Sequence, residues 1–423
     1  MHHRTCAMLT SLAVIMATTF VITARADQVT DWNQYMLQAT LVAKTTPIPM
    51  TRNAAIVQAA VFDAVNGINP RYTPIHVKSA APGGASRRAA AVQAAYVSLV
   101  NLYPTQISTL DAQRAASLMA ILKGGGHERV RSVLAGIQWG QTVADAIWAW
   151  RSTDGFNPPP PPFVGGTNIG QWRPTPPAFA SGVLPQLGYT TAWAILAPSQ
   201  FRPGGPPALN SDRYTEVFNE TKSMGSLNSA VRTADQTLYA LFWNASTGSY
   251  FWDSVAVSLS KQHHKTLLQN ARILALLNIA MADAAIACWE AKYYYVFWRP
   301  VTAIPLADSD GNAATMPDPN FQPLFATPAH PEYPSGHSTI SSSATRVLAH
   351  FFGNRTSFTV QSDVMLGVER SFNSFSDALR EVTNARVFAG IHFRTACEDG
   401  EATGNAVANY ILANALQPVE NDD

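Results

Sequence analysis

The fold of this 423-residue chain is decided by the stretch LLNIAMADAAIACWEAKYYYVFWRP at residues 276–300. Its apolar side chains recur at helical spacing, and Pro300 is expected to stop the helix because proline cannot continue one. Lys292 and Arg299 are separated only by aromatic and apolar residues. This spacer predicts a helix that is buried nearly all round.

Helical periodicity also dominates the rest of the chain. It is clear in AAIVQAAVFDAVNGI at 54–68 and AAAVQAAYVSLVNLY at 89–103, and it returns from Ser211 onwards. Strand-type alternation is scarce. The sequence therefore predicts an all-α protein with two helical bundles, the first within 27–153 and the second within 208–423.

The segment 154–207 differs from the rest of the chain in amino-acid composition. It holds 13 of the 28 prolines, in NPPPPPFVGG, RPTPPAF and RPGGPPA, which exclude a regular helix. Irregular connections of this length in a compact protein are often functional lids. Two interpretations stay open, a lid over a functional site and a linker wrapped over the surface.

Residues 1–26 resemble a secretory signal peptide. A weakly basic start precedes an apolar stretch, and Ala24-Arg25-Ala26 fits a small-x-small cleavage site. No other segment offers about 18 consecutive uncharged apolar residues. We therefore expect a secreted or periplasmic protein whose mature form has no membrane span.

Charge and cysteine content exclude several classes of function. Without Arg4 and Arg25 the mature chain has 27 basic and 28 acidic residues, which gives no electrostatic case for binding nucleic acid or an anionic membrane. Cys288 and Cys397 remain, either as a disulfide or as free thiols. The ten histidines form no HExxH motif, so no zinc or di-iron site is predicted. The oligomeric state is left open.

Cationic side chains occur at the end of the apolar stretch 276–300 and again near residue 390. Lys292 and Arg299 lie seven residues apart, which would place both on one face of a helix. Arg386 and His392 lie six apart in NARVFAGIHFR, so a continuous helix would aim them apart. Gly390 between them offers a break that could re-aim His392.

The motif PSGH at 334–337 predicts a helix start, which we group with these cationic residues and His392. Three permanent cations within 5 Å would repel by about 3 kcal/mol per pair, so an anion must lie among them. One interpretation is an internal network with the acids Glu290, Glu332, Glu398 and Asp399. The free N–H groups of a helix start at Ser335 and Gly336, beside His337 and His392, instead suit a tetrahedral oxyanion.

These three motifs, K-x6-RP at 292–300, PSGH at 334–337 and R-x5-H at 386–392, are similar in order and spacing to a known signature. It belongs to the superfamily of vanadium-dependent haloperoxidases, type 2 phosphatidic acid phosphatases and class A acid phosphatases. The resemblance covers about residues 289–400 and implies that superfamily's helical bundles. The sequence departs from it at Ala385, usually Ser, and at Ala396, often Asp, so the contacts that hold Arg386 and His392 are in doubt.

The resemblance implies a role for each matching residue. The equatorial oxygens of vanadate, or of phosphate in a phosphatase, would be bound by Lys292, Arg299, Ser335, Gly336 and Arg386. His392 would be the axial ligand of vanadium, or would form a phosphohistidine. His337, with a pKa near neutrality, would be the acid-base residue.

Two enzyme activities and one non-catalytic role are compatible with this set. The length of the chain and its Pro-rich segment resemble haloperoxidases, with hydrogen peroxide and halide as substrates, more than soluble acid phosphatases acting on a phosphomonoester. A secreted oxyanion-binding protein without activity is the third candidate, for which Ala385 and Ala396 are the best support.

The halide preference rests on His330. Family members that oxidise chloride resemble one another in having Phe here, and those that oxidise bromide in having His. His330 would make the halide side of the pocket polar and add a titrating group, and Trp289 matches an aromatic wall of the family's site. We expect oxidation of bromide and iodide with little chloride activity. The alternative is that His330 only caps the turn before Pro331.

Overall fold

The computed structural model describes residues 27–124 and 128–419, so the proposed signal peptide at 1–26 lies outside the described residues. The described residues are mainly α-helical, as the sequence predicts. The helices are α1 (Gln28–Val42), α2 (Pro47–Asn66), α3 (Arg87–Leu102), α4 (Ile107–Lys123), α5 (Val130–Arg151), α6 (Asp212–Gly225), α7 (Ala234–Ala245), α8 (Gly248–Gln262), α9 (Leu267–Tyr295), α10 (Pro300–Ala303), α11 (Gly336–Phe352), α12 (Phe375–Phe388) and α13 (Arg394–Asn414). The strands β1 (Phe358–Gln361) and β2 (Glu369–Phe372) form one antiparallel hairpin.

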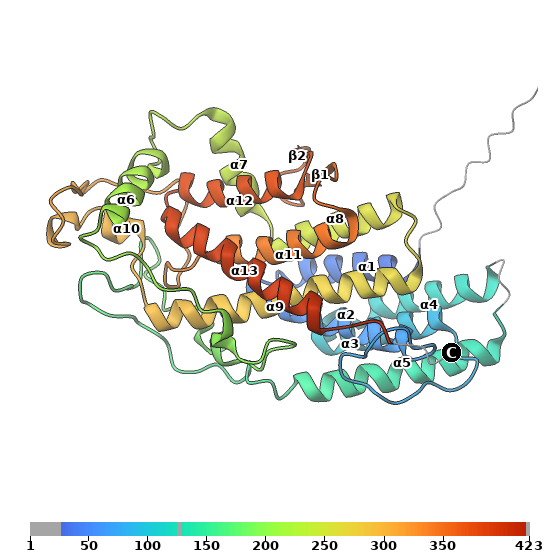
Figure 1. Cartoon of the computed structure of the whole chain (residues 1–423). Coiled ribbons are helices and arrows are strands. Elements are labelled where there is room, and N and C mark those ends of the chain that lie inside the picture. The colour runs from blue at the N-terminus through green and yellow to red at the C-terminus, as the bar shows by residue number, and fades with distance from the viewer. Residues whose placement is uncertain (1–26, 125–127, 420–423) are drawn as a thin grey trace, which may run out of the picture.

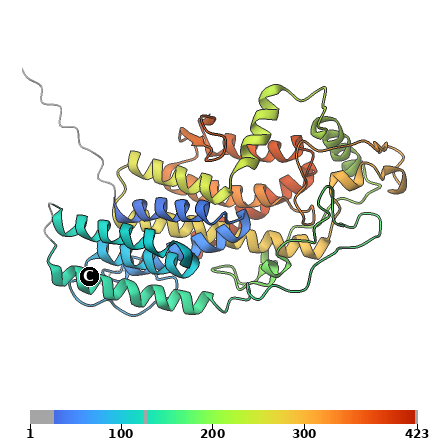
Figure 2. The same ribbon diagram turned by 180° about the vertical axis from the view of Figure 1, so that it is seen from behind.

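Two groups of helices share the central helix α9. In Figures 1 and 2, α1 to α5 form one group, and α7, α8 and α11 to α13 form the other, with α9 between them. Helix α2 packs against α9 from the first group, and α11 and α13 pack against it from the second. One continuous apolar core therefore spans both groups.

Helix α9 is buried because nearly its whole circumference is Ala, Leu, Ile or Met. Within the described residues it is the one helix long and apolar enough to cross a membrane, and 94% of its most apolar window is buried by other parts of the protein. It passes this test although Asp283 interrupts its apolar run. Burial of this kind is typical of the core helix of a helical bundle.

The Pro-rich segment 154–207 contains no α-helix and only two short 3-10 turns, η2 (Pro185–Tyr189) and η3 (Pro198–Phe201). It runs along α9 and is tied to it by Asp283. This fully buried carboxylate accepts hydrogen bonds from the backbone N–H groups of Trp193, Ala194 and Ile195 at 2.7–3.0 Å. The segment is therefore anchored on the core.

The end of α9 differs from the prediction in a way that matters for the site. The helix ends at Tyr295, where Val296 adopts a left-handed conformation (φ 50°), and Pro300 begins α10. The Pro-rich segment causes this change, since Trp172 N–H bonds to the carbonyl of Val296 and Trp298 N–H to that of Gly170. Arg299 thus extends from a loop and does not share a helix face with Lys292.

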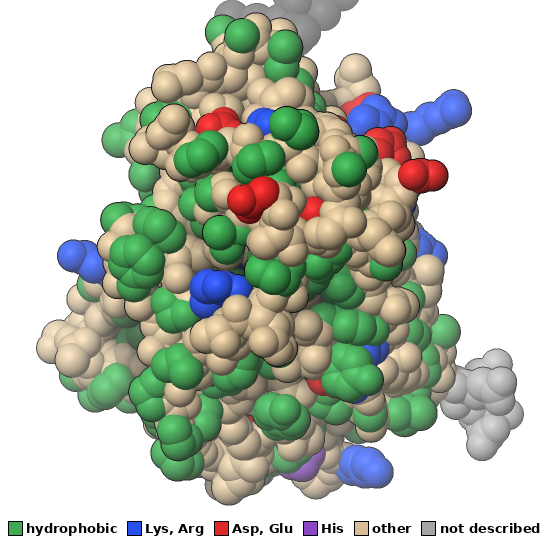
Figure 3. All heavy atoms as spheres, turned by 90° about the vertical axis from the view of Figure 1, so that its left-hand side faces the viewer, with side chains coloured by type: hydrophobic (Ala, Val, Ile, Leu, Met, Phe, Trp, Pro, Cys, Tyr) green, Lys and Arg blue, Asp and Glu red, His purple; other side chains and the backbone are tan. Residues whose placement is uncertain are grey.

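Burial at this end of α9 is also less complete than predicted. Lys292 is fully buried, but Tyr294 is 60% exposed. On the end face of the molecule seen in Figure 3, acidic and basic side chains are mixed among apolar and neutral ones.

Candidate active site

Six of the nine predicted site residues line one cavity of about 560 Å³. Its wall includes Trp289 from α9, His330 from the loop before α11, Gly336 and His337 from the first turn of α11, Arg386 from α12, and His392 from the turn before α13. Lys292, Arg299 and Ser335 are fully buried. The backbone break at Gly390 (φ 74°) separates α12 from His392, as the sequence predicts, so that Arg386 and His392 line the same cavity.

Lys292 holds the loop that leads into α11. Its ammonium donates to the carbonyls of Pro331, Glu332 and Pro334 at 2.8, 3.0 and 2.5 Å. An ammonium has three N–H groups, so all of them are engaged. Burial lowers the pKa of Lys292 to about 7. Lys292 therefore gives the site a positive charge that is lost above neutral pH.

Arg299 joins the three segments of the site. It donates to the carbonyl oxygens of His330 at 2.9 Å and Ile391 at 2.7 Å, and it contacts His330 Nδ1 at 2.9 Å and His392 Nε2 at 3.1 Å. A guanidinium can only donate. Nε2 of His392 must therefore present its lone pair to Arg299, and the ring proton must lie on Nδ1.

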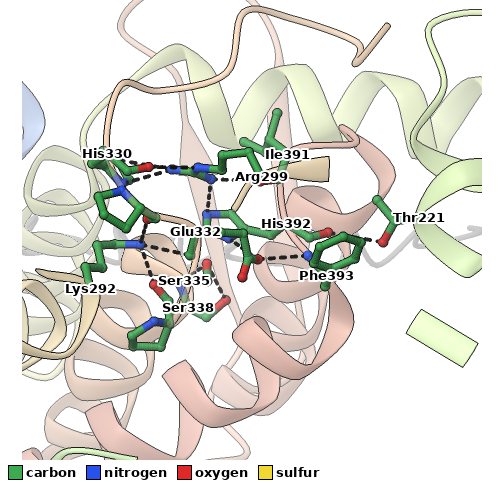
Figure 4. Close-up of polar contacts among 12 residues, drawn as sticks. Thr221, Lys292, Arg299, His330, Glu332, Ser335, Ser338, Ile391, His392 and Phe393 are labelled. Atoms are coloured by element: carbon green, nitrogen blue, oxygen red, sulfur yellow. Dashed lines mark hydrogen bonds and ion pairs between the residues drawn. The ribbon is translucent and has the colours of Figure 1, made fainter. Parts of the chain in front are cut away.

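Glu332 holds the other side of the His392 ring. Its Oε1 lies 2.9 Å from His392 Nδ1 and also accepts the Phe393 N–H at 2.9 Å. Figure 4 shows Arg299 and Glu332 bonded to the two different nitrogens of His392. Burial raises the pKa of the Glu332 carboxyl to about 7. A neutral imidazole with an unprotonated Nε2 is the form that can ligate a metal or attack phosphorus.

Replacing Glu332 by Gln tests this arrangement. The amide oxygen can still accept from Nδ1, but the negative charge that makes the imidazole more basic is lost. We expect oxyanion affinity to fall by about 10- to 100-fold, the usual effect of removing a partner behind a ligating histidine. Nitrogen-15 NMR of His392 in the unmodified protein, measured without oxyanion, should show a proton on Nδ1. Unchanged affinity in Glu332→Gln would contradict this role.

The start of α11 leaves two backbone donors without a partner among the residues that the structure describes. Ser335 is the N-cap, its own N–H bonds to the Ala396 carbonyl, and its Oγ caps the N–H of Ser338. Of the four N–H groups that a helix start leaves without intrahelical partners, those of Gly336 and His337 remain. A Cβ at Gly336 would lie 3.1 Å from the ring of Trp289. Glycine thus keeps open the space above these donors.

Arg386 supplies side-chain donors to the same space. Among the described residues its recorded hydrogen-bond partner is Asn244 Oδ1, at 3.3 Å, and its buried Nε has none. Burial lowers the pKa of Arg386 to about 9, so the group stays charged at neutral pH. A buried cation with an unpaired donor, beside free helix N–H groups, fits a tetrahedral oxyanion.

Comparisons with known proteins agree with this geometry. Residues 272–421 match the family described as the second helical-bundle domain of vanadium chloroperoxidase. The chain is 23% identical to the vanadium chloroperoxidase of Curvularia inaequalis, over 86% of this chain and 78% of that protein. The matched residues contain all three motifs that resemble the signature of vanadium haloperoxidases and type 2 phosphatidic acid phosphatases.

Solved structures show the same fold. A bacterial vanadium-dependent iodoperoxidase superposes with a TM-score of 0.79 at 24% identity, covering 94% of this chain and 98% of that one. The apo form of a bacterial vanadium-dependent chloroperoxidase gives a TM-score of 0.68 at 17% identity, covering 87% and 94%. The prediction of the superfamily's helical fold is confirmed.

Two departures from the superfamily's pattern can now be placed. Ala385 and Ala396 are fully buried, and neither can hold a ligand. A carboxylate contact to His392 is nevertheless present, and it comes from Glu332 in the loop before α11. From its position in the sequence, Glu332 is only one of four acids that could form a network. The only sequence signal for a role of Glu332 in the site is its position three residues before Ser335 of the PSGH motif.

The alternative of an internal acid network is not what the structure shows. Glu290 pairs with Arg202, Glu398 pairs with Arg213, and Asp399 accepts from Tyr333. Of these acids, Glu332 alone contacts the cluster. Cys288 and Cys397 are buried free thiols, so they form no disulfide.

The histidines titrate differently from the prediction. Burial, together with Lys292 and Arg299, lowers the pKa of His330 well below its usual range, and burial with Arg386 does the same for His337. Both rings are therefore neutral near pH 7 in the oxyanion-free site. The expectation that His330 adds a titrating group, and that the pKa of His337 lies near neutrality, is wrong for this state. His330 also contacts Arg299, so it does more than cap a turn.

Proposed function

We propose that this protein is a vanadate-dependent haloperoxidase that oxidises halide with hydrogen peroxide. The observation that carries the proposal is the His392 ring, held between Glu332 and Arg299 with its Nε2 unprotonated. The match of residues 272–421 to a vanadium chloroperoxidase domain and the similarity to a vanadium chloroperoxidase support it.

The donors described above fit vanadate. His392 Nε2 would ligate the vanadium, while Arg386, Arg299 and the N–H groups of Gly336 and His337 would hold the oxygens. Vanadate, when bound, supplies a Lewis-acidic centre at which hydrogen peroxide becomes an oxidant for halide. The negative charge of an oxyanion opposes the field of the cations and so raises the pKa of His337. His337 could then give or take the proton that peroxide binding requires.

Phosphatase activity is the second candidate. The same donors fit phosphate, and a neutral imidazole backed by a carboxylate can act as a nucleophile. A bromination assay with orthovanadate and hydrogen peroxide, run beside a phosphomonoesterase assay, decides between the two. Oxyanion binding without either activity would indicate the non-catalytic role.

Phosphate and vanadate should compete for this site, and binding should weaken as the pH rises through 7. Above this pH Lys292 loses its charge, and this change disfavours an anion. The affinity should fall by up to about tenfold per pH unit for each linked proton. Sulfate is the suitable calorimetric probe because its own charge is constant over pH 5–9. Non-competitive binding of phosphate and vanadate, or an affinity that rises with pH, would contradict the shared site.

The halide preference is tested at His330. We expect the unmodified protein to oxidise bromide and iodide with little chloride activity, and His330→Phe to shift activity towards chloride. Phenylalanine makes this side of the pocket less polar and releases one Arg299 N–H to the oxyanion. Steady-state rates with each halide at mildly acidic pH are the measurement, with the exposed His350→Phe as the matched control. Efficient chloride oxidation by the unmodified protein would refute the role of His330.

A further inference from the structure

The turn that leads from α12 to His392 is held by helices outside the matched domain. It comprises residues 388–392 and connects Arg386 on α12 to the proposed vanadium ligand. Helices α6 and α7 both pack against α12, as Figure 1 shows, and both precede the matched residues 272–421. The family match therefore does not describe what these two helices contribute to the site.

Arg232, in the loop between α6 and α7, joins this loop to the end of α12. Its Nη1 donates to the carbonyls of Met224, Ser226 and Phe388 at 2.7, 2.8 and 2.9 Å, and its Nε donates to Thr237 Oγ1 at 3.0 Å. Phe388 is the last residue of α12, and the last carbonyls of a helix have no partner within it. A cation at this end also interacts favourably with the helix dipole. Arg232 therefore caps α12 at the start of the turn.

Helix α6 contacts the same turn at two further points. A Cβ at Gly225 would lie 2.3 Å from the Cα of Gly390, so the two backbones touch. Gly225 has no positive φ, and its need for glycine comes from this close approach. One turn earlier in α6, Thr221 Oγ1 donates to the His392 carbonyl at 3.3 Å, as Figure 4 shows. We call Thr221, Gly225 and Arg232 the α6–α7 clamp.

The direction of the His392 ring depends on the backbone of this turn. Arg299 and Glu332 bond to the two ring nitrogens, but they can do so only where the turn places the ring. Contacts that orient a ligating histidine from outside typically change its affinity for a metal by about 10- to 100-fold.

We propose that the residues of the α6–α7 clamp are positioning residues for His392. They are not among the described residues that line the cavity, so they act on a bound oxyanion only through the turn. This inference rests on the proposed function and adds to it residues that set the affinity for vanadate.

Two substitutions test the clamp in different ways. Arg232→Met removes the donor to the Phe388 carbonyl, and Gly225→Ala forces the backbone at Gly390 to move. In both variants we expect the affinity for orthovanadate, measured by calorimetry, to fall at least about tenfold. The affinity for sulfate, which forms no bond to a histidine nitrogen, should change much less. Nitrogen-15 NMR without oxyanion should show shifted His392 ring signals, because the ring moves away from its two partners.

Gly136→Ala is the matched control. A Cβ at Gly136 would lie 2.4 Å from the Ser86 carbonyl oxygen, which is a similar clash, but between α5 and the start of α3 in the other group of helices. We expect this variant to lower the melting temperature, as Gly225→Ala does, and to leave the vanadate affinity and the His392 signals unchanged.

The outcomes separate the clamp from the proposed function. If both clamp variants melt earlier but keep the vanadate affinity and His392 signals of the unmodified protein, the clamp is only structural and the proposal is overturned. Arg232→Met decides alone if Gly225→Ala does not fold. If the unmodified protein binds neither sulfate nor vanadate, the proposed function is overturned instead.

Discussion

Replacing His392 by alanine is expected to reduce turnover at least about a thousandfold, because no other group near the oxyanion donors offers a nitrogen lone pair held in this orientation. The substitution removes a ring of which only 2% is exposed, and it leaves a cavity, so some stability is lost as well. Activity with reconstituted vanadate and a thermal melt of each protein are the measurements.

His337→Ala is the matched control for this experiment. His337 lines the cavity, but no lone pair of its ring is held between an arginine and a carboxylate as that of His392 is. We expect the variant to turn over slowly and to retain bound vanadate. If the two variants lose vanadate binding equally, the division of roles between these histidines is wrong.

Arg299→Met and Arg386→Met are expected to abolish oxyanion binding with opposite effects on stability. Removing Arg299 leaves the His330 and Ile391 carbonyls and His392 Nε2 without their donor, which should lower the free energy of unfolding by about 3–5 kcal/mol. Arg386 has one long side-chain hydrogen bond and an unpaired Nε. Replacing this poorly paired buried cation should raise the free energy of unfolding by on the order of 1 kcal/mol.

Urea denaturation of the oxyanion-free variants, with sulfate titrations beside it, measures both effects. A stability loss in Arg386→Met as large as that in Arg299→Met would mean that Arg386 is a structural residue. The role of Arg386 as a donor kept unpaired for binding an anion would then be wrong.

Much of the site could be predicted because its residues are brought together by local features. Pro334 and Ser335 are residue types that commonly precede a helix. Gly390 supplies the positive φ that separates α12 from His392. The apolar periodicity of α9 likewise predicts a central buried helix. Each of these features depends on residues within a few positions of one another.

What could not be predicted depends on contacts between distant segments. Arg299 leaves the axis of α9 because the Pro-rich segment bonds to the backbone on either side of Phe297. Glu332 meets His392 across 60 residues of sequence, and spacing alone did not single it out from the other acids. The pKa values of His330 and His337 follow from burial among cations, which a neutral composition does not reveal.

Diffraction at the vanadium absorption edge, from crystals soaked in orthovanadate, tests the central claim most directly. We expect one anomalous peak at bonding distance from His392 Nε2, between Arg386 and the N–H groups of Gly336 and His337. The peak should disappear when phosphate is added in excess. A peak bonded to another residue, or one that persists beside bound phosphate, would contradict the account.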